Sequence, residues 1–200
     1  MEALIMAGGK GSRMRELPVE KPMIEINGIP SVERMIHTLR ESGRIDRILV
    51  SVSHNTPLTE RHIADMGIEV IMTTGDDYVS DLHEAFRLLE GRYVLTIPAD
   101  MPLLHSSTVS SFIDHFERNP NDSMTAIIRE DVVIEAGMTP SYAFDLDGER
   151  WVLSGMNIMD RQKILDGVVV DYDYYRTDSV DLAMNMNTPG ELAAVRSYLY

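Results

Sequence analysis

The first half of the chain alternates between short apolar runs and longer amphipathic stretches. The apolar runs that suit buried strands are 4–6, 48–52, 68–72 and 93–97. The stretches with apolar residues at helical spacing are 31–43, 56–66 and a segment around 82–89. Ser31 is the expected N-cap of the first helix and Gly43 its expected stop. Strands that alternate with helices in this way predict a parallel sheet with crossover helices.

The second half is less regular and predicts antiparallel strands beside the parallel ones. A helix over 107–116 precedes a strand at 124–128. Residues 142–152 have the pattern of a hairpin that turns at Asp147 and Gly148. The expected fold is therefore α/β, with a mostly parallel sheet flanked by helices and an antiparallel addition in the second half.

The end of the chain predicts one more strand and a closing helix. The strand is expected at 182–186, and Thr188 and Glu191 have the spacing of a capping box just after it. The buried side of the final helix would then carry Leu192, Val195 and Leu199.

Composition limits the classes of function. A length of 200 residues with 44% hydrophobic content suits one domain over 1–200. No apolar run approaches the roughly 18 to 20 residues that cross a bilayer, so we expect a cytoplasmic protein without a membrane span. The net charge of −14 argues against a nucleic-acid partner, although a small phosphate ligand stays compatible with a locally basic loop. The absence of cysteine excludes disulfides, thiolate metal sites and cysteine nucleophiles.

A glycine-rich loop follows the first strand and is the first candidate for chemistry. Its residues are Ala7, Gly8, Gly9, Lys10, Gly11, Ser12 and Arg13. Glycines let successive backbone N–H groups turn toward an anion, while Lys10 and Arg13 add positive charge. The spacing matches neither the dinucleotide-binding fingerprint nor the P-loop. From the residues alone, a phosphate site and an ordinary strand-to-loop turn are equally open.

Carboxylate and amide oxygens late in two strands suggest a metal site. Asp100 follows the strand at 93–97, where ligands of open α/β sheets usually bind, although an aspartate there can also cap the next helix. Asn185 and Asn187 would share one face of the expected last strand, and either could instead be structural. Magnesium prefers such oxygen ligands. The histidine spacing gives no zinc motif.

Polar loops after the second and third strands are candidates for holding a nucleoside. His54 lies in the first of these loops, and Gly75, Ser80 and Asp81 lie in or just after the second. Gly75 would let a base approach the backbone closely, while Ser80 and Asp81 would offer polar contacts.

Three motifs resemble the nucleotidyltransferase superfamily, which includes sugar-nucleotide pyrophosphorylases and molybdenum cofactor guanylyltransferases. They are the glycine-rich loop with Lys21-Pro22 downstream, residues 98–103 around Asp100, and residues 185–189. The resemblance implies a Rossmann-like sheet of the nucleotide-diphospho-sugar transferase type. It implies that the loop wraps a triphosphate and that Arg13 and Lys21 neutralise its charge. It also implies that Asp100 holds Mg²⁺, with Asn187 or Asn185 nearby.

Less specific stretches resemble a narrower family, the archaeal GTP:adenosylcobinamide-phosphate guanylyltransferases. These stretches are 53–59, 75–82, 154–158 and 185–192. The resemblance implies transfer of GMP from GTP to adenosylcobinamide phosphate in cobalamin biosynthesis. It also implies that Gly155 and Asn157 line the acceptor side, although Gly155 is equally consistent with a strand bulge.

Two other functions stay open at this point. One is the same transfer to another acceptor, molybdenum cofactor or phospholactate. The other is a nucleotide-binding regulatory domain without catalysis, against which the presence of both Lys21 and Asp100 weighs. The sequence leaves a homodimer open and assigns no acceptor contact to residues 130–139.

Overall fold

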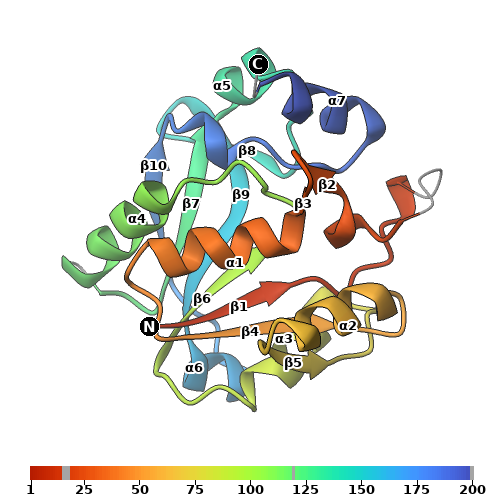
Figure 1. Cartoon of the computed structure of the whole chain (residues 1–200). Helices are drawn as coiled ribbons and strands as arrows, with labels where there is room; N and C mark the ends of the chain where they lie inside the picture. The colour runs from red at the N-terminus through yellow and green to blue at the C-terminus, as the bar shows by residue number, and fades with distance from the viewer. Residues whose placement is uncertain (15–18, 119, 199–200) are drawn as a thin grey trace.

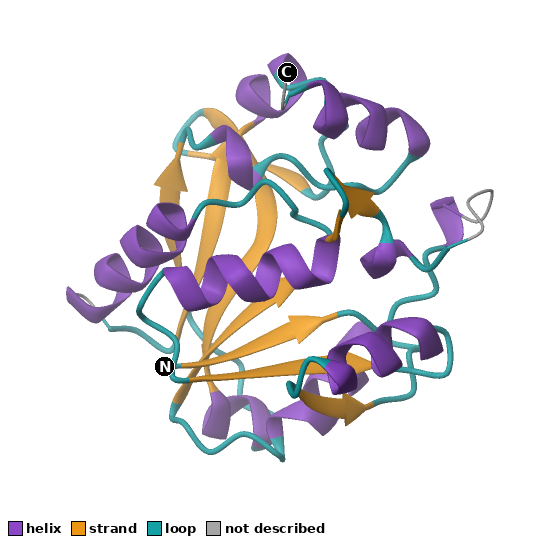
Figure 2. Ribbon diagram, viewed as in Figure 1, coloured by secondary structure: helices purple, strands orange, loops and turns teal. Residues whose placement is uncertain are grey.

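The computed structural model describes residues 1–14, 19–118 and 120–198, and Leu199 lies outside these ranges. Eight strands form one mixed sheet in the order β10-β7-β9-β6-β1-β4-β5, with β8 paired to β9 (Figure 1). The strands are β1 (Glu2–Met6), β4 (Arg47–Val52), β5 (Glu69–Met72), β6 (Tyr93–Pro98), β7 (Ser123–Arg129), β8 (Ala143–Leu146), β9 (Glu149–Asp160) and β10 (Tyr172–Thr177). A separate two-stranded sheet pairs β2 (Glu25–Ile26) with β3 (Ile29–Pro30). The strands of the large sheet fan out with a strong twist (Figure 2).

The first half of the chain builds the parallel part of the sheet, as predicted. β1 lies between β4 and β6 and runs parallel to both, and β5 runs parallel to β4. The connecting helices are α1 (Ser31–Glu41), α2 (Pro57–Asp65) and α3 (Tyr78–Phe86). The carboxyl ends of four strands therefore meet at one edge, and the loops that leave them lie close together.

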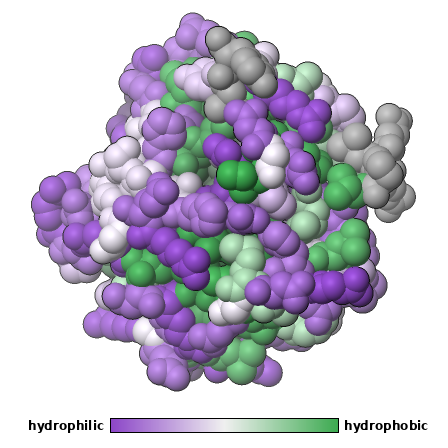
Figure 3. Space-filling view, viewed as in Figure 1, coloured by the Kyte–Doolittle hydropathy of each residue, from purple (hydrophilic) through white to green (hydrophobic). Residues whose placement is uncertain are grey.

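The helices pack in two layers, one on each face of the sheet. One buried cluster joins the sheet to α1, α2 and α4 (Ser106–Arg118), and α1 and α4 cross the near face in Figure 1. The outer side of this layer is largely hydrophilic (Figure 3), as expected for helices whose apolar stripe faces a core. A second cluster joins the other face to α3 and α6 (Arg161–Leu165).

The antiparallel addition in the second half is also confirmed. β9 pairs antiparallel with both β6 and β7, and β8 and β9 form the predicted hairpin. At its turn Asp147 and Gly148 have φ values of 54° and 83°, the positive values that a two-residue type I′ turn requires. Two further helices, α5 (Glu130–Glu135) and α7 (Pro189–Ser197), complete this half.

The strand expected at 182–186 is wrong. Val180–Leu182 is instead the 3₁₀ helix η3, and a loop leads from it to α7. Leu182, Ala183, Met184 and Met186 are all buried, so both sides of the segment face the interior and the two-residue alternation carries no strand signal. β10 forms one edge of the sheet, where it pairs parallel with β7, and it was not predicted from its mixed aromatic and charged residues.

The expected N-cap of the first helix is also wrong. Ser31 is the first residue within α1, and its hydroxyl donates a 2.7 Å hydrogen bond to the carbonyl of Ala99 instead of capping the helix. Gly43 follows the end of α1 with a φ of 65°, as a helix stop requires. Ser31 therefore ties α1 to the segment that carries Asp100.

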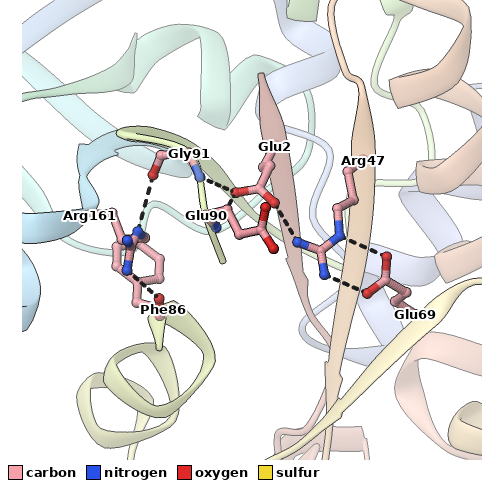
Figure 4. A network of polar contacts seen from close by, with 7 residues as sticks. All are labelled: Glu2, Arg47, Glu69, Phe86, Glu90, Gly91 and Arg161. Atoms are coloured by element: carbon pink, nitrogen blue, oxygen red, sulfur yellow. Dashed lines mark hydrogen bonds and ion pairs between the residues drawn. The ribbon is translucent and has the colours of Figure 1, made fainter. Parts of the chain in front are cut away.

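A network of charged groups joins the amino ends of β1, β4 and β5, where Glu2, Arg47 and Glu69 are the first residues of the strands (Figure 4). The Arg47 guanidinium donates two hydrogen bonds to the Glu69 carboxylate, at 2.7 and 2.6 Å, and one of 2.7 Å to Glu2. Glu2 also accepts hydrogen bonds from the backbone N–H groups of Glu90 and Gly91. Burial would raise the pKa of Glu2, but the amides of Gly91 and Glu90 and the Arg47 guanidinium outweigh it, and the pKa lies below its ordinary value.

Replacing Arg47 with Met should destabilise the fold, because it leaves the Glu2 side chain, only 11% exposed, without its cation. We expect the free energy of unfolding at pH 7 to fall by about 1 to 2 kcal/mol, near the low end for an unsatisfied polar group because water reaches Arg47. Urea denaturation would measure the loss.

The pH dependence of this loss has a definite sign. A depressed pKa stabilises the fold above the unfolded value of about 4.3, and that contribution disappears as the pH falls through the folded value. The difference in the free energy of unfolding between Arg47→Met and wild type should therefore narrow as the pH falls. Arg44→Met, whose partners Asp114 and Glu117 are exposed, is the matched control and should change little. A difference that stays constant down to acid pH would contradict this account.

Candidate functional site

A pocket of about 420 Å³ lies at the carboxyl ends of the parallel strands. It is lined by residues 6–14, Lys21, Pro22, residues 75–78, Asp81, residues 98–100 and Asn187. The sequence-predicted residues that meet here are Ala7, Gly8, Gly9, Lys10, Gly11, Ser12, Arg13, Lys21, Gly75, Asp81, Asp100 and Asn187. The fold thus brings the glycine-rich loop, the lysine, the aspartate and a late asparagine to one place.

The glycine-rich loop continues β1 and is pressed against the end of β4. The Ala7 N–H donates to the Ser51 carbonyl at 2.8 Å, and the Ser53 hydroxyl donates to the Gly8 carbonyl at 2.6 Å. A Cβ at Gly8 would lie 3.1 Å from the backbone carbon of Val52. A glycine suits this position because a side chain would crowd the neighbouring backbone.

Two cations, one carboxylate and one carboxamide meet at the centre of the pocket. Lys21, in the 3₁₀ helix η2 (Lys21–Met23), forms an ion pair with Asp100 and donates to Asn187 Oδ1 at 2.8 Å. Arg13, in the 3₁₀ helix η1 (Ser12–Met14), donates to the same oxygen at 3.3 Å. The side chains of Lys21 and Asp100 are only 18% and 13% exposed. Water screens this pair weakly, so a charged ligand would interact strongly with both groups.

Asn185 reaches the same carboxylate although it does not line the pocket. Its Nδ2 lies 3.5 Å from Asp100 Oδ1, and the Met186 N–H donates to the Asp100 carbonyl at 3.0 Å. Both asparagines therefore approach Asp100 from a loop and not, as expected, from one face of a strand.

The loop after β5 is held in place by small polar side chains. Asp81, which is buried, accepts from the Gly75 N–H at 3.0 Å and from the Thr74 hydroxyl at 2.9 Å. Asn55 Nδ2 lies 3.4 Å from the Gly75 carbonyl. Gly75 has a φ of 71°, and a Cβ there would lie 2.3 Å from Ser53 Oγ. Ser53 and Asn55 were not singled out as site residues, since only the loop that contains them was identified.

His54 and Ser80 lie outside the pocket lining, and both are exposed. The Ser80 N–H donates to Asp77, the N-cap of α3, at 2.8 Å. At the pocket mouth Lys10 Nζ lies 2.8 Å from Asp76 Oδ1. The hydrogen bond from the Lys10 ammonium group lowers the pKa of Asp76. In the loop after β5, Asp76 and Asp77 line the pocket, whereas Ser53 and Asn55 in the loop after β4 only contact the loops that line it.

Gly155 and Asn157 lie beside the pocket on β9. Gly155 has a φ of 89° at the register shift between β7 and β9, and a Cβ there would lie 3.3 Å from Pro98, which lines the pocket. Asn157 accepts from the Thr125 hydroxyl at 2.7 Å and donates to the Gly155 carbonyl at 3.0 Å. Gly155 is therefore both a bulge residue and a close neighbour of the pocket wall.

The buried carboxylate of Glu191 contacts the backbone of Asn187. Thr188 caps α7 as predicted, since its hydroxyl accepts from the Glu191 N–H at 3.2 Å. The Glu191 carboxylate, however, accepts from the Asn187 N–H at 2.9 Å and not from that of Thr188. The capping box is thus displaced by one residue, and Glu191 holds the backbone of a pocket residue.

The oxygen groups at the centre of the pocket fit a magnesium ion better than a zinc ion. In the part of the chain that the structure describes, no group of three His, Cys, Asp or Glu side chains is placed to hold a metal. Asp100 supplies one carboxylate and Asn187 one amide oxygen beside a phosphate-type loop. Mg²⁺ commonly binds through one or two carboxylates, with substrate phosphates and waters as the other ligands, so this donor set fits.

Within the described ranges, no helix is long and apolar enough to cross a membrane.

Comparisons with known proteins find relatives of this chain in sequence. A family model described as "MobA-like NTP transferase domain" matches residues 3–147. An adenosylcobinamide-phosphate guanylyltransferase from Methanocaldococcus jannaschii is 29% identical over 96% of this chain and 94% of its own length. A molybdenum cofactor guanylyltransferase from Shewanella sediminis is 26% identical over 63% of this chain and 62% of its own length.

Solved structures with the same fold share little sequence with the chain. HddC from Yersinia pseudotuberculosis, complexed with GMP-PN, superimposes with a TM-score of 0.75 at 16% identity, over 100% of this chain and 99% of HddC. A CMP:2-keto-3-deoxy-manno-octonic acid synthetase complexed with CTP gives a TM-score of 0.71 at 15% identity, over 100% and 98% of the two chains. At these identities the comparison supports the fold, which is that of the nucleotide-diphospho-sugar transferases.

Replacing Gly75 with Ala should weaken nucleotide binding. The new Cβ would collide with Ser53 Oγ, and the positive φ adds strain of roughly 1 to 2 kcal/mol, so the loop must move. We expect the dissociation constant for a nucleoside triphosphate to rise about tenfold or more in calorimetric titration. Gly43→Ala has a similar φ with nothing within 4 Å, so it carries the strain without the collision. If both variants bind the nucleotide equally well, the collision at Gly75 is unimportant.

Proposed function

The chain belongs to the MobA-like NTP transferase family, and from this premise we propose that it transfers GMP from GTP to a phosphorylated acceptor. The observation that carries the proposal is the cluster of Arg13, Lys21, Asp100 and Asn187 beside a glycine-rich loop. A largely buried lysine and an exposed arginine next to a loop rich in backbone donors suit a polyanion such as a triphosphate.

In the proposed reaction no covalent enzyme intermediate forms. An oxygen of the acceptor's phosphate forms a bond to the α-phosphorus of GTP. The bond from that phosphorus to the bridging oxygen breaks, and its electron pair leaves with pyrophosphate. A phosphate acceptor is already ionised at neutral pH, so the reaction needs no general base. Catalysis then depends on positioning and on neutralising charge.

Each group of the cluster has a role in this proposal. The amides of the glycine-rich loop and Lys10 hold phosphate oxygens, and Arg13 and Lys21 stabilise the charge that builds up on pyrophosphate. Asp100 and Asn187, with Asn185 close by, would hold Mg²⁺, which neutralises phosphate charge when it is bound. Gly75 and Asp81 shape the loop beside the nucleoside.

The proposed acceptor is adenosylcobinamide phosphate. The relative from M. jannaschii that carries this name matches almost the whole chain, which supports this acceptor over those of relatives that match less of it. Gly155 adds support, because it lies against Pro98 of the pocket wall and so places β9 within reach of an acceptor bound there.

A different acceptor is the second candidate. The relatives named for molybdenum cofactor share the family and cover a smaller part of the chain. Phospholactate is the other acceptor to test. A nucleotide-binding domain without catalysis is disfavoured, since Lys21 and Asp100 meet in the pocket and the family is one of transferases.

Replacing Asp100 with Ala should abolish turnover and leave the fold intact. Removing a group that supports several kcal/mol of transition-state stabilisation lowers the rate by roughly a hundredfold or more. The wild-type protein should also bind GTP more tightly when Mg²⁺ is added, and Asp100→Ala should lose this gain in calorimetric titration. Asp114→Ala, an exposed position on α4, is the control. Near-normal turnover of Asp100→Ala with Mg²⁺ would refute the metal role.

The acceptor is tested directly by measuring pyrophosphate release. The protein is incubated with GTP and Mg²⁺ together with adenosylcobinamide phosphate, molybdenum cofactor or phospholactate. We expect the highest kcat/KM with adenosylcobinamide phosphate. Preferred transfer to either of the others would overturn the acceptor and keep the reaction, while release with none of them would favour the non-catalytic alternative. Gly155→Asp, which adds bulk and negative charge beside Pro98, should lower transfer to the true acceptor.

A further inference from the structure

Glu20 immediately precedes Lys21 but does not line the pocket. Its carboxylate accepts three hydrogen bonds from the start of α2. They come from the Leu58 N–H at 2.7 Å, the Thr59 N–H at 2.8 Å and the Thr59 hydroxyl at 2.6 Å. A carboxylate accepting several N–H and O–H donors at a helix N-terminus is a strong contact, because charge-assisted hydrogen bonds and the helix dipole act together.

The first N–H groups of α2 are available to Glu20 because Thr56, the N-cap residue of this helix, makes no side-chain hydrogen bond to them. Thr56 Oγ1 accepts from the Ser53 N–H at 3.1 Å and makes no side-chain hydrogen bond to the helix. The first N–H groups of a helix have no partner within the helix. Glu20, which lies 38 residues before Leu58 in the chain, fills that role from outside the helix.

The contact fixes the backbone from which Lys21 extends. The Glu20 carbonyl accepts the Met23 N–H at 2.9 Å, which closes η2, and Lys21 then reaches across the pocket to Asp100 and Asn187. A lysine side chain is long and flexible, so its ammonium group is held at one place only when its backbone is fixed.

We propose that Glu20 is a positioning residue that places the Lys21 ammonium group for the transfer reaction, an inference that rests on the proposed function. The same contact joins Lys21 to the other side of the pocket. The segment that leads into α2 contains Ser53, which holds the carbonyl of Gly8, and Asn55, which approaches that of Gly75. Glu20 thus links the lysine to the loops that carry the phosphates and the nucleoside.

A double-mutant cycle tests this inference. The proteins are wild type, Glu20→Ala, Lys21→Met and the double variant, and the measurements are kcat and KM for GTP and the dissociation constant for GTP. We expect Glu20→Ala to lower kcat/KM about tenfold or more, and to have little further effect once Lys21 is Met. Thr59→Val, which removes one of the three donors, should give a smaller loss of the same kind.

The control is Glu60→Ala, next to Thr59 in the first turn of α2, which should leave the kinetics unchanged. Equal losses from Glu20→Ala in both backgrounds would overturn the inference, because a merely structural residue acts independently of Lys21. If Glu20→Ala does not fold, Thr59→Val alone and with Lys21→Met gives the same comparison. If no acceptor supports turnover, the proposed function fails, and the GTP dissociation constants of the four proteins still decide the role of Glu20.

Discussion

The ion pair between Lys21 and Asp100 requires two segments 79 residues apart in the chain to meet in a largely buried place. Removing both charges from water costs several kcal/mol, and their attraction repays this only when both are held in good geometry. The fold supplies that geometry. Asp100 follows β6, and its carbonyl accepts a hydrogen bond from the Met186 N–H. Lys21 follows Glu20, whose carboxylate is hydrogen-bonded to the start of α2. A buried ion pair is weak evidence for stability, and this is a physical reason to interpret the pair as functional.

Local patterns were sufficient to predict most of the fold. The parallel strands are apolar runs separated by amphipathic helices, and the β8–β9 hairpin has the Asp147-Gly148 turn that fixes its register. The errors came where burial did not follow a local period. The segment 182–186 is buried on all sides without being a strand, whereas β10 carries tyrosines and charges and becomes a strand by pairing with β7. Tertiary packing decided the first case and strand pairing the second, and no window of sequence contains either.

The same distinction applies to the site. Residues within a motif, such as Lys21 and Asp100, could be named from the sequence because the motif fixes their neighbours. The residues that fix the backbone of the pocket segments could not be named from the sequence. Glu20 and Ser53 contact backbone groups 38 and 45 residues away, so no local spacing marks them. Glu191 was recognised as part of a capping box, yet its carboxylate turned to Asn187. A motif therefore identifies the groups that face a ligand, and the fold identifies the groups that fix them.

The charge balance of the pocket explains how a protein with a net charge of −14 can bind a triphosphate. Exposed charges more than about 8 Å away are largely screened at physiological ionic strength, so the ligand responds mainly to the groups that line the pocket. Lys10 and Lys21 are each paired with an aspartate in the structure, Asp76 and Asp100. A triphosphate that takes Lys21 from Asp100 leaves this carboxylate, only 13% exposed, without a cation. Uncompensated charge in such a place is costly, so the nucleotide should bind best together with a divalent cation that Asp100 can accept.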